Sequence, residues 1–507
     1  MPVKITGKDL TLADIWNVAY NFETIELDEI SQEKVIKCRN YVEKIIKENR
    51  VVYGLTTGFG KFSTVRIPAD QIEELQENLI ISHSTGVGNY LSIPETRAVM
   101  LLRINVLARG HSGIRLSTLQ TLIDMLNARI HPCIPEKGSV GASGDLAPLS
   151  HLALVLLGKG KAEFNGRIIS GKLAMKKAGI APVKLKAKEG LALNNGTQVM
   201  TAVGALNLIR ARNLVKQADI IAAASIDAML GTASAFDALV HKQRPHKGQL
   251  TSAENLRKLL AESELNCSHE NCENVQDAYS IRCTPQVNGA VRDALDYVQS
   301  VIEVEINSAT DNPLIFPDED KVISGGNFHG EPVAFALDTL GIVVSELGNI
   351  ADRRLEHILN PALNRGLNPF LASRPGLDSG FMIAQVTTAS LVSENKIHAH
   401  PSSVDSVPTS ANQEDHVSMG TIGAMKARTI IENVSFILGI ELMIAIQALD
   451  SRPLISSPPL EAVRGEIRKT VKTLKKDRLL NVDINNMKRI IDSAILIDVV
   501  SKFVDLD

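Results

Sequence analysis

The sequence is poor in cysteine, in aromatic residues and in net charge. Five cysteines in 507 residues, odd in number and irregularly spaced, argue against a disulfide framework and for a reduced compartment. A formal net charge of −3 at pH 7 provides no broad cationic surface for nucleic acid or for an anionic membrane. We therefore expect a cytoplasmic protein that acts on a small molecule, with no nucleic-acid or membrane partner.

Signals for secretion, membrane insertion and nucleotide binding are also missing. The first residues lack a basic region followed by an apolar stretch, so we expect no secretory signal. The most apolar tract, 220–239, contains Asp227 and Asp237 and suits a buried helix better than a membrane span. The glycines of 54–60 neither follow a strand nor open a βαβ unit, so a nucleotide fingerprint is not expected.

Helical periodicity dominates what is present. The longest segments with few helix breakers are 198–242, 286–307, 331–358, 382–398 and 416–448. They exceed the usual helix length of about 11–12 residues, so they should pack alongside one another. A hairpin is predicted at 161–170, where Asn165-Gly166 is the favoured turn.

These patterns predict a mainly α protein with two domains. Residues 1–197 are expected to form a smaller N-terminal domain, and residues 198–507 an elongated bundle of long helices with a C-terminal helical region. The polar, Gly- and Pro-rich bridges between the long segments are where reactive groups are expected to lie.

The tripeptide Ala142-Ser143-Gly144, within 138–149 (GSVGASGDLAPL), can become an electrophile without an added cofactor. Attack of the Gly144 nitrogen on the Ala142 carbonyl, with loss of two waters, one of which carries the Ser143 hydroxyl, produces a methylidene-imidazolone ring. Gly144 presents an uncrowded nitrogen, and the flanking glycines allow the backbone to fold on itself. By itself, the tripeptide also fits a Gly-rich turn before a helix.

Four further segments accompany the tripeptide in order: 53–60 (YGLTTGFG), 276–282 (QDAYSIR), 324–331 (SGGNFHGE) and 410–416 (SANQEDH). Together they resemble the aromatic amino acid lyase family, which contains histidine, phenylalanine and tyrosine ammonia-lyases and related aminomutases. The resemblance implies a 4-methylidene-imidazol-5-one group (MIO) formed from Ala142-Ser143-Gly144, with no external cofactor. It also implies a homotetramer in which several subunits assemble each pocket.

The resemblance assigns chemical roles to three side chains. Tyr53 would be the base that removes the substrate β-proton, which requires nearby positive charge or hydrogen bonds to lower its pKa. Arg282 would grip the substrate carboxylate with its planar fork, and Tyr279 would lie near the ring carbonyl. Without the resemblance, Tyr53 would be interpreted as a hydroxyl at the rim of a Gly-rich loop, and Arg282 as one member of a surface ion pair.

Further positions of the pocket follow from the same resemblance. Asn195 would lie beside the prosthetic ring and the substrate amine, although it could equally cap the helix predicted to begin near Gln198, and Asn194 beside it leaves the assignment open. Three other residues map onto the pocket: Gln276, Asn327 and Phe328. Asn327 would lie near the substrate carboxylate and the ring, and Phe328 would form an apolar wall.

Substrate choice is expected to depend on His83, Glu414 and Met382. The pair Ser82-His83 and the string NQEDH at 412–416 resemble the histidine-specific members of the family, whereas the phenylalanine and tyrosine enzymes tend to lack the glutamate. A carboxylate can accept an imidazole N–H and would be poorly satisfied against a phenyl ring. The thioether of Met382 would pack against a flat ring, unless it is plain core.

The resemblance therefore implies elimination of ammonia from L-histidine to give trans-urocanate. A tyrosine or phenylalanine ammonia-lyase or aminomutase is the alternative within the family, and a helical scaffold that has lost activity is the alternative of another class.

Two groups of residues are candidate metal ligands. Cys267, His269 and Cys272 could begin a zinc site, but no second pair lies at a suitable spacing. His398 and His400, two residues apart, would face different sides of a helix. We therefore predict no metal.

Overall fold

The computed structural model describes residues 2–268 and 275–507, which form two compact units. The first unit comprises 1–207, 299–338 and 401–425, and the second comprises 208–298, 339–400 and 426–507. Each unit is thus assembled from three separate segments, because long helices pass from one unit into the other. The boundary predicted between an N-terminal domain, 1–197, and a helix bundle, 198–507, stays a prediction.

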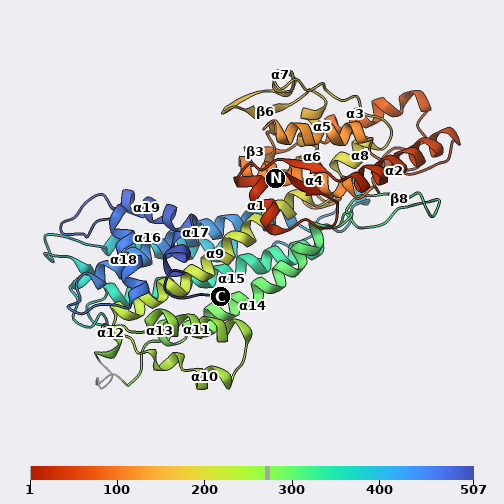
Figure 1. Ribbon diagram of the computed structural model, residues 1–507. Coiled ribbons are helices and arrows are strands. Elements are labelled where there is room, and N and C mark those ends of the chain that lie inside the picture. Colours follow the sequence, from red (N-terminus) through yellow and green to blue (C-terminus); the bar gives the residue numbers. More distant parts are fainter. Residues whose placement is uncertain (1, 269–274) are drawn as a thin grey trace. The chain divides into compact units, whose positions relative to one another are not determined.

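Helices account for 59% of the chain, so the prediction of a mainly α fold is confirmed. Four long helices carry residues of both units: α9 (Gln198–Ala228), α14 (Thr284–Glu305), α15 (Glu331–Leu359) and α17 (Gly420–Leu449) (Figure 1). Four of the five long predicted segments match their helices within a few residues. The segment 198–242 does not continue as one helix, because α9 ends at Ala228 and Leu230 adopts φ 54°, a left-handed conformation that ends a helix.

The first unit carries the shorter helices of the N-terminal region and several small sheets. Its helices are α1 (Leu12–Tyr20), α2 (Glu29–Lys47), α3 (Ile72–His83), α4 (Ile93–Ala108), α5 (Leu116–Asn127), α6 (Leu146–Leu156), α7 (Gly171–Lys177) and α8 (Glu189–Asn194). Its strands are β1 (Val3–Ile5), β2 (Ile25–Leu27), β3 (Val87–Tyr90), β4 (His131–Pro132), β5 (Pro135–Lys137), β6 (Lys161–Phe164), β7 (Arg167–Ser170), β8 (Leu314–Phe316) and β9 (Lys321–Ile323).

The sheets of the first unit have two or three strands each. β1 pairs with β2 in parallel, whereas β3–β5, β4–β6–β7 and β8–β9 are antiparallel. The predicted hairpin is confirmed: β6 and β7 pair from Lys161↔Ser170 to Phe164↔Arg167, and Asn165 and Gly166 both adopt positive φ, as a type I′ turn requires.

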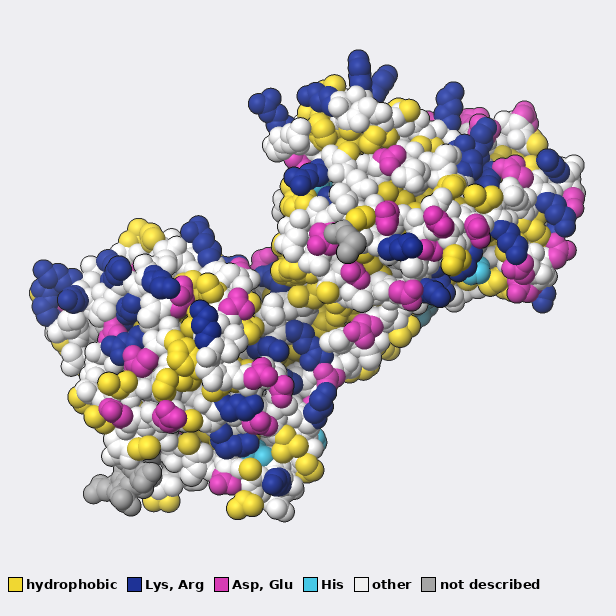
Figure 2. Space-filling view, viewed as in Figure 1, with side chains coloured by type: hydrophobic (Ala, Val, Ile, Leu, Met, Phe, Trp, Pro, Cys, Tyr) yellow, Lys and Arg dark blue, Asp and Glu magenta, His cyan; other side chains and the backbone are white. Residues whose placement is uncertain are grey.

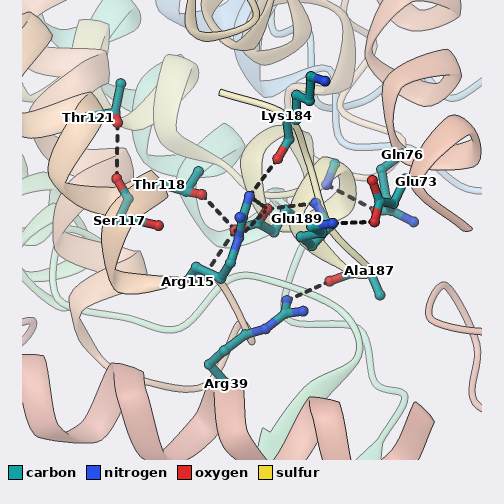
Figure 3. Close-up of polar contacts among 12 residues, drawn as sticks. Arg39, Glu73, Gln76, Arg115, Ser117, Thr118, Thr121, Lys184, Ala187 and Glu189 are labelled. Carbon is teal, nitrogen blue, oxygen red and sulfur yellow. Dashed lines mark hydrogen bonds and ion pairs between the residues drawn. The ribbon is translucent and has the colours of Figure 1, made fainter. Parts of the chain in front are cut away.

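Two arrangements of polar groups position the segment that ends in Asn195. Glu189 begins α8 with a fully buried carboxylate, which accepts from Arg115 Nη2 at 2.7 Å and from the Thr118 hydroxyl at 2.7 Å (Figure 3). Behind α8, the buried guanidinium of Arg103 on α4 donates to the Asn195 carbonyl at 2.7 Å. Because a buried carboxylate or guanidinium is costly unless it is fully paired, these contacts hold the end of α8 in one place.

The second unit packs long helices around buried polar pairs. Its shorter helices are α10 (Ala238–Lys242), α11 (Lys247–Leu260), α12 (Glu264–Cys267), α13 (Tyr279–Arg282), α16 (Met382–His398), α18 (Pro458–Thr470), α19 (Leu480–Asp492) and α20 (Ile495–Val500). Glu441 on α17 accepts from Ser225 on α9 at 2.8 Å and from Arg354 on α15 at 2.5 and 3.0 Å. The predicted side-by-side packing is therefore confirmed for these three helices.

Charged side chains of both signs are interspersed over the face shown in Figure 2, in keeping with the small net charge. Among the described residues, α15 and α17 are the two helices long and apolar enough to span a membrane, with mean hydropathy of 1.5 and 1.8 over their most apolar stretches. Those stretches are 67% and 83% buried, as is typical of helices that form a protein core.

Candidate active site

The loop that carries Ala142, Ser143 and Gly144 connects β5 to α6 and doubles back on itself. Ala142 and Gly144 form an isolated bridge, and Gly144 also pairs with Gly196. Gly144 has φ 67°, and a Cβ added there would lie 2.2 Å from the Gly196 carbonyl oxygen. Only glycine fits this position, which keeps the nitrogen that would attack Ala142 uncrowded.

Asp145 anchors the end of this loop. Its fully buried carboxylate accepts from the backbone N–H groups of Val199 and Met200, both at 2.9 Å, at the N-terminus of α9. Burial raises the pKa of Asp145 to about 6, although these donors and the Thr421 hydroxyl act in the opposite direction. No role is predicted for Asp145 from the sequence, although its position directly after the tripeptide could have indicated that it supports the loop.

Two cavities of the first unit open onto Ser143. One, of about 760 Å³, is lined by residues that include Tyr53, His83, Asn195 and Glu414. The other, of about 610 Å³, shares Tyr53, Asn195 and Glu414 and adds Ala142 and Phe328. The structure thus brings together around Ser143 six residues predicted from distant parts of the sequence: Tyr53, His83, Ala142, Asn195, Phe328 and Glu414.

Tyr53 lies in the turn segment between α2 and α3. Its hydroxyl accepts from the Gly60 N–H at 3.1 Å, which holds the phenol at the cavity wall. Burial raises the pKa of Tyr53 above its ordinary value of 10.0, and the negative charge of Glu414 acts in the same direction. The prediction that the surroundings lower this pKa is therefore wrong for the chain taken by itself, because burial outweighs the Gly60 hydrogen bond.

His83 ends α3 and lines the first of the two cavities. The Ser82 hydroxyl lies 3.2 Å from the Leu79 carbonyl, to which it donates, and 3.0 Å from His83 Nδ1. Because this hydroxyl has one proton, it accepts from the Nδ1–H, and Nε2 keeps its lone pair. Burial lowers the pKa of His83, which favours this neutral form.

Glu414 contributes an acceptor that lacks a partner. Its Oε2 atom is buried, and it has no hydrogen bond within the described part of the chain. A buried carboxylate oxygen without a donor costs free energy, so the cavity favours a molecule that offers an N–H or O–H at this point.

Asn327 and Asn312 are held by backbone groups near the second cavity. The Asn327 side chain donates to the Ala309 carbonyl at 3.2 Å and does not line either cavity. Asn312, which the sequence analysis missed, lines the second cavity and accepts from the Gly325 N–H at 2.9 Å. Its neighbour Asp311 forms a fully buried ion pair with Lys188 at 2.8 Å, which fixes this backbone beside Asn195.

Four predicted residues belong to the second unit, whereas the described residues that line the two cavities all belong to the first unit. The four are Gln276, Tyr279, Arg282 and Met382. Tyr279 is 72% exposed, and the Arg282 guanidinium lies 4.7 Å from its ring centroid. Arg282 Nε is buried and has no hydrogen-bond partner in the described residues, and Met382 at the start of α16 is 37% exposed. The cysteine-rich zinc hypothesis falls largely on 269–274, outside the described residues; Cys267 is exposed.

Comparisons with known proteins identify the family of this chain. The sequence profile described as aromatic amino acid lyase matches residues 10–469. The chain is 53% identical over 505 residues to the histidine ammonia-lyase of Alkaliphilus oremlandii, covering 99% of both chains. It is also 53% identical over 493 residues to that of Caldanaerobacter subterraneus subsp. tengcongensis, covering 97% of each.

Solved structures give the same result. A crystal structure of histidine ammonia-lyase from Trypanosoma cruzi is 44% identical with a TM-score of 0.93, covering 100% of this chain and 96% of that one. Tyrosine aminomutase from Streptomyces globisporus is 39% identical with a TM-score of 0.94, covering 100% of both. The chain belongs to the aromatic amino acid lyase family, as the sequence predicted. Within that family it is an enzyme of the ammonia-lyase class.

Proposed function

We propose that this enzyme eliminates ammonia from L-histidine to give trans-urocanate. The observation that carries the proposal is the unpartnered, buried Oε2 of Glu414 in the same cavity as Ser143 and His83. An imidazole ring has an N–H to donate to this oxygen, whereas a phenyl ring has none. The histidine ammonia-lyases at 53% identity support the same substrate.

The loop geometry fits a prosthetic group made from Ala142, Ser143 and Gly144. The bridge between Ala142 and Gly144 brings the two ends of the tripeptide together, the packing against Gly196 requires glycine, and Ser143 faces both cavities. Such a ring supplies an electrophilic methylene that assists departure of the amine. No external cofactor is part of the proposal.

The chain's own side chains then bind the substrate and move its proton. Tyr53 accepts the β-proton in its phenolate form, which becomes the neutral phenol, and the Gly60 N–H holds its oxygen in place. Asn195, fixed by Arg103, lies beside the substrate amine. Arg282 pairs with the substrate carboxylate, which fixes the molecule for deprotonation. The residues Gln276, Tyr279, Asn327, Phe328 and Met382 complete the pocket in this proposal.

A homotetramer with pockets shared among subunits is part of the same proposal. Its support is the division of the predicted residues between the two units, together with the exposure of Tyr279 and Met382 and the unpartnered Nε of Arg282. A polar group without a partner in one chain is explained if a neighbouring subunit completes a pocket in which the substrate contacts that group. We place the enzyme in the cytoplasm, with no nucleic-acid or membrane partner.

The first experiment tests substrate and prosthetic group together. Purified protein is incubated with L-histidine while the near-ultraviolet absorbance of urocanate is followed, with L-tyrosine and L-phenylalanine in parallel. The intact mass should be lower than the encoded mass by two water molecules. Ser143→Ala should keep the mass encoded by its gene and lose activity, because no hydroxyl is available for elimination. An unmodified wild-type mass with full activity would overturn the proposal.

The second experiment tests the shared pocket. Ser143→Ala and Arg282→Ala chains, each expected to be inactive alone, are co-expressed with different affinity tags, and hybrid oligomers are purified. Restored activity in the hybrids is expected if the two residues of one pocket come from different chains. Hybrids that are tetrameric but inactive would mean that each pocket uses a single chain.

A further inference from the structure

Two histidines and a glutamate converge beside the second cavity. His329 precedes α15, Glu331 begins it, and His416 lies in the loop before α17. His329 Nδ1 is 4.0 Å and His416 Nε2 is 3.9 Å from Glu331 Oε2. One ligand atom from each residue lies within 4.8 Å of the others, and the imidazole rings stack at 5.5 Å with an interplanar angle of 7°. Three potential metal ligands therefore lie close enough together to be shared by one cation after a small rearrangement of the side chains.

The hydrogen bonds of His329 leave the appropriate nitrogen unprotonated. Nε2 lies 3.3 Å from the backbone carbonyl of His416, to which only an N–H can donate. Nδ1 accepts from the Glu331 N–H at 3.4 Å, a long and therefore weak hydrogen bond that a metal ion bound at Nδ1 would replace. A ring in which one nitrogen donates to a backbone carbonyl and the other faces a carboxylate has the arrangement typical of metal-binding histidines.

Glu331 supplies an acceptor without a hydrogen bond. Its Oε2 is buried and has no hydrogen-bond partner within the described residues, although the side chain as a whole is 23% exposed. The two imidazoles lie too far from this oxygen, at 3.9 and 4.0 Å, to satisfy it directly. A cation between the three groups would compensate this buried negative charge.

We propose that His329, Glu331 and His416 bind a divalent first-row transition metal such as Zn²⁺. Ligand atoms about 2.0–2.2 Å from a tetrahedral zinc lie about 3.4 Å from each other. The atoms here are 3.9 and 4.0 Å from Glu331 Oε2 and within 4.8 Å of one another, so they must approach by about 0.5 Å or more. The His416 side chain is 66% exposed and is free to make that adjustment. Imidazole ligands favour such metals over Mg²⁺ or Ca²⁺, which prefer oxygen.

A set of two histidines and one glutamate leaves at least one coordination position open. His329 and His416 line the cavity that also contains Ser143 and Glu414, so the open position lies at the edge of the candidate active site. The sequence analysis predicted no metal, because more than eighty residues separate His416 from the other two ligands and no spacing rule connects them. The proposal does not rest on the identity of the substrate.

The experiment measures metal binding without substrate. Chelator-treated protein is titrated with Zn²⁺ by calorimetry and with Co²⁺ by visible absorption, which reports imidazole and carboxylate ligation. We expect one Zn²⁺ per chain in the wild type, and an affinity at least about tenfold lower in Glu331→Gln and in His416→Ala. Thermal unfolding and circular dichroism check that both variants fold; His416→Gln replaces any variant that does not.

The matched control is His398→Ala. His398 Nε2 lies 3.8 Å from Glu394 Oε1, so it also pairs a histidine with a glutamate, but no third ligand joins them within the described residues. This variant should bind Zn²⁺ as the wild type does. The proposal is overturned if the wild type binds no stoichiometric metal, or if Glu331→Gln and His416→Ala bind it as tightly as His398→Ala.

Discussion

Glu414→Gln should weaken the enzyme on L-histidine much more than on L-phenylalanine. The buried Oε2 of Glu414 has no hydrogen bond within the described residues, so in the proposed complex it takes its donor from the substrate ring. Glutamine keeps the shape of the side chain but removes the charge and can place an NH₂ donor against a ring N–H. Loss of such a buried hydrogen bond costs about 1–3 kcal/mol.

That cost corresponds to a drop of about 5- to 150-fold in kcat/KM for L-histidine. For L-phenylalanine the change should be smaller or even favourable, because the variant no longer places an unpaired carboxylate against an apolar ring. The assay measures kcat/KM for both substrates from the near-ultraviolet absorbance of urocanate and cinnamate. The quantity of interest is the ratio of the two constants in wild type and variant.

Glu77→Gln is the matched control, because Glu77 lies on the helix α3 that carries His83 but makes an exposed ion pair with Lys159 at 3.1 Å. Exposed pairs of this kind contribute little, so both constants should stay unchanged. An unchanged substrate ratio in Glu414→Gln would refute the reasoning and leave His83 as the remaining candidate for reading the imidazole.

Three further predictions concern the base, the carboxylate contact and the loop anchor. Tyr53→Phe should lower kcat strongly with little change in KM, because it removes the proposed base. In the wild type, kcat should rise with pH through the neutral range, because burial raises the pKa of Tyr53. A variant with wild-type kcat would mean that another residue is the base. Arg282→Lys should lower kcat/KM by an amount that corresponds to roughly 2 kcal/mol, since a lysine cannot make the bidentate pair. The control is Arg353→Lys, which changes a largely exposed arginine. Effects of equal size in the two variants would contradict the role of Arg282. The raised pKa of Asp145, about 6 against an ordinary 3.8, means that the folded state binds more protons than the unfolded state around and between these pH values. Its contribution to the free energy of unfolding therefore falls by about 3 kcal/mol in total as pH rises from about 3 to about 7, and it is constant above. Denaturant titrations at several pH values should show this trend in the difference between wild type and Asp145→Asn, and a difference independent of pH would be inconsistent with it.

Local sequence signals predicted the elements whose conformation depends on neighbouring residues. Asn165-Gly166 predicted the β6–β7 hairpin because its positive φ values are a property of those two residues. The scarcity of helix breakers in 382–398 predicted α16 with its observed bounds. The prediction that one segment continues to residue 242 was wrong, because α9 ends before the left-handed residue Leu230. Leucine rarely adopts positive φ, so its presence in the sequence does not indicate a helix end.

The sequence by itself determined the chemistry that is available: Ala142-Ser143-Gly144 has the atoms needed for ring formation, and the accompanying motifs identify the family. Only the tertiary structure decided which side chains share a cavity with Ser143. It also decided that the Asp145 carboxylate is fully buried against the N-terminus of α9, and that burial raises rather than lowers the pKa of Tyr53. It also brought His416 to His329 and Glu331. The physical reason is that desolvation and charge–charge interactions depend on distances in space, and groups separated by tens or hundreds of residues set those distances.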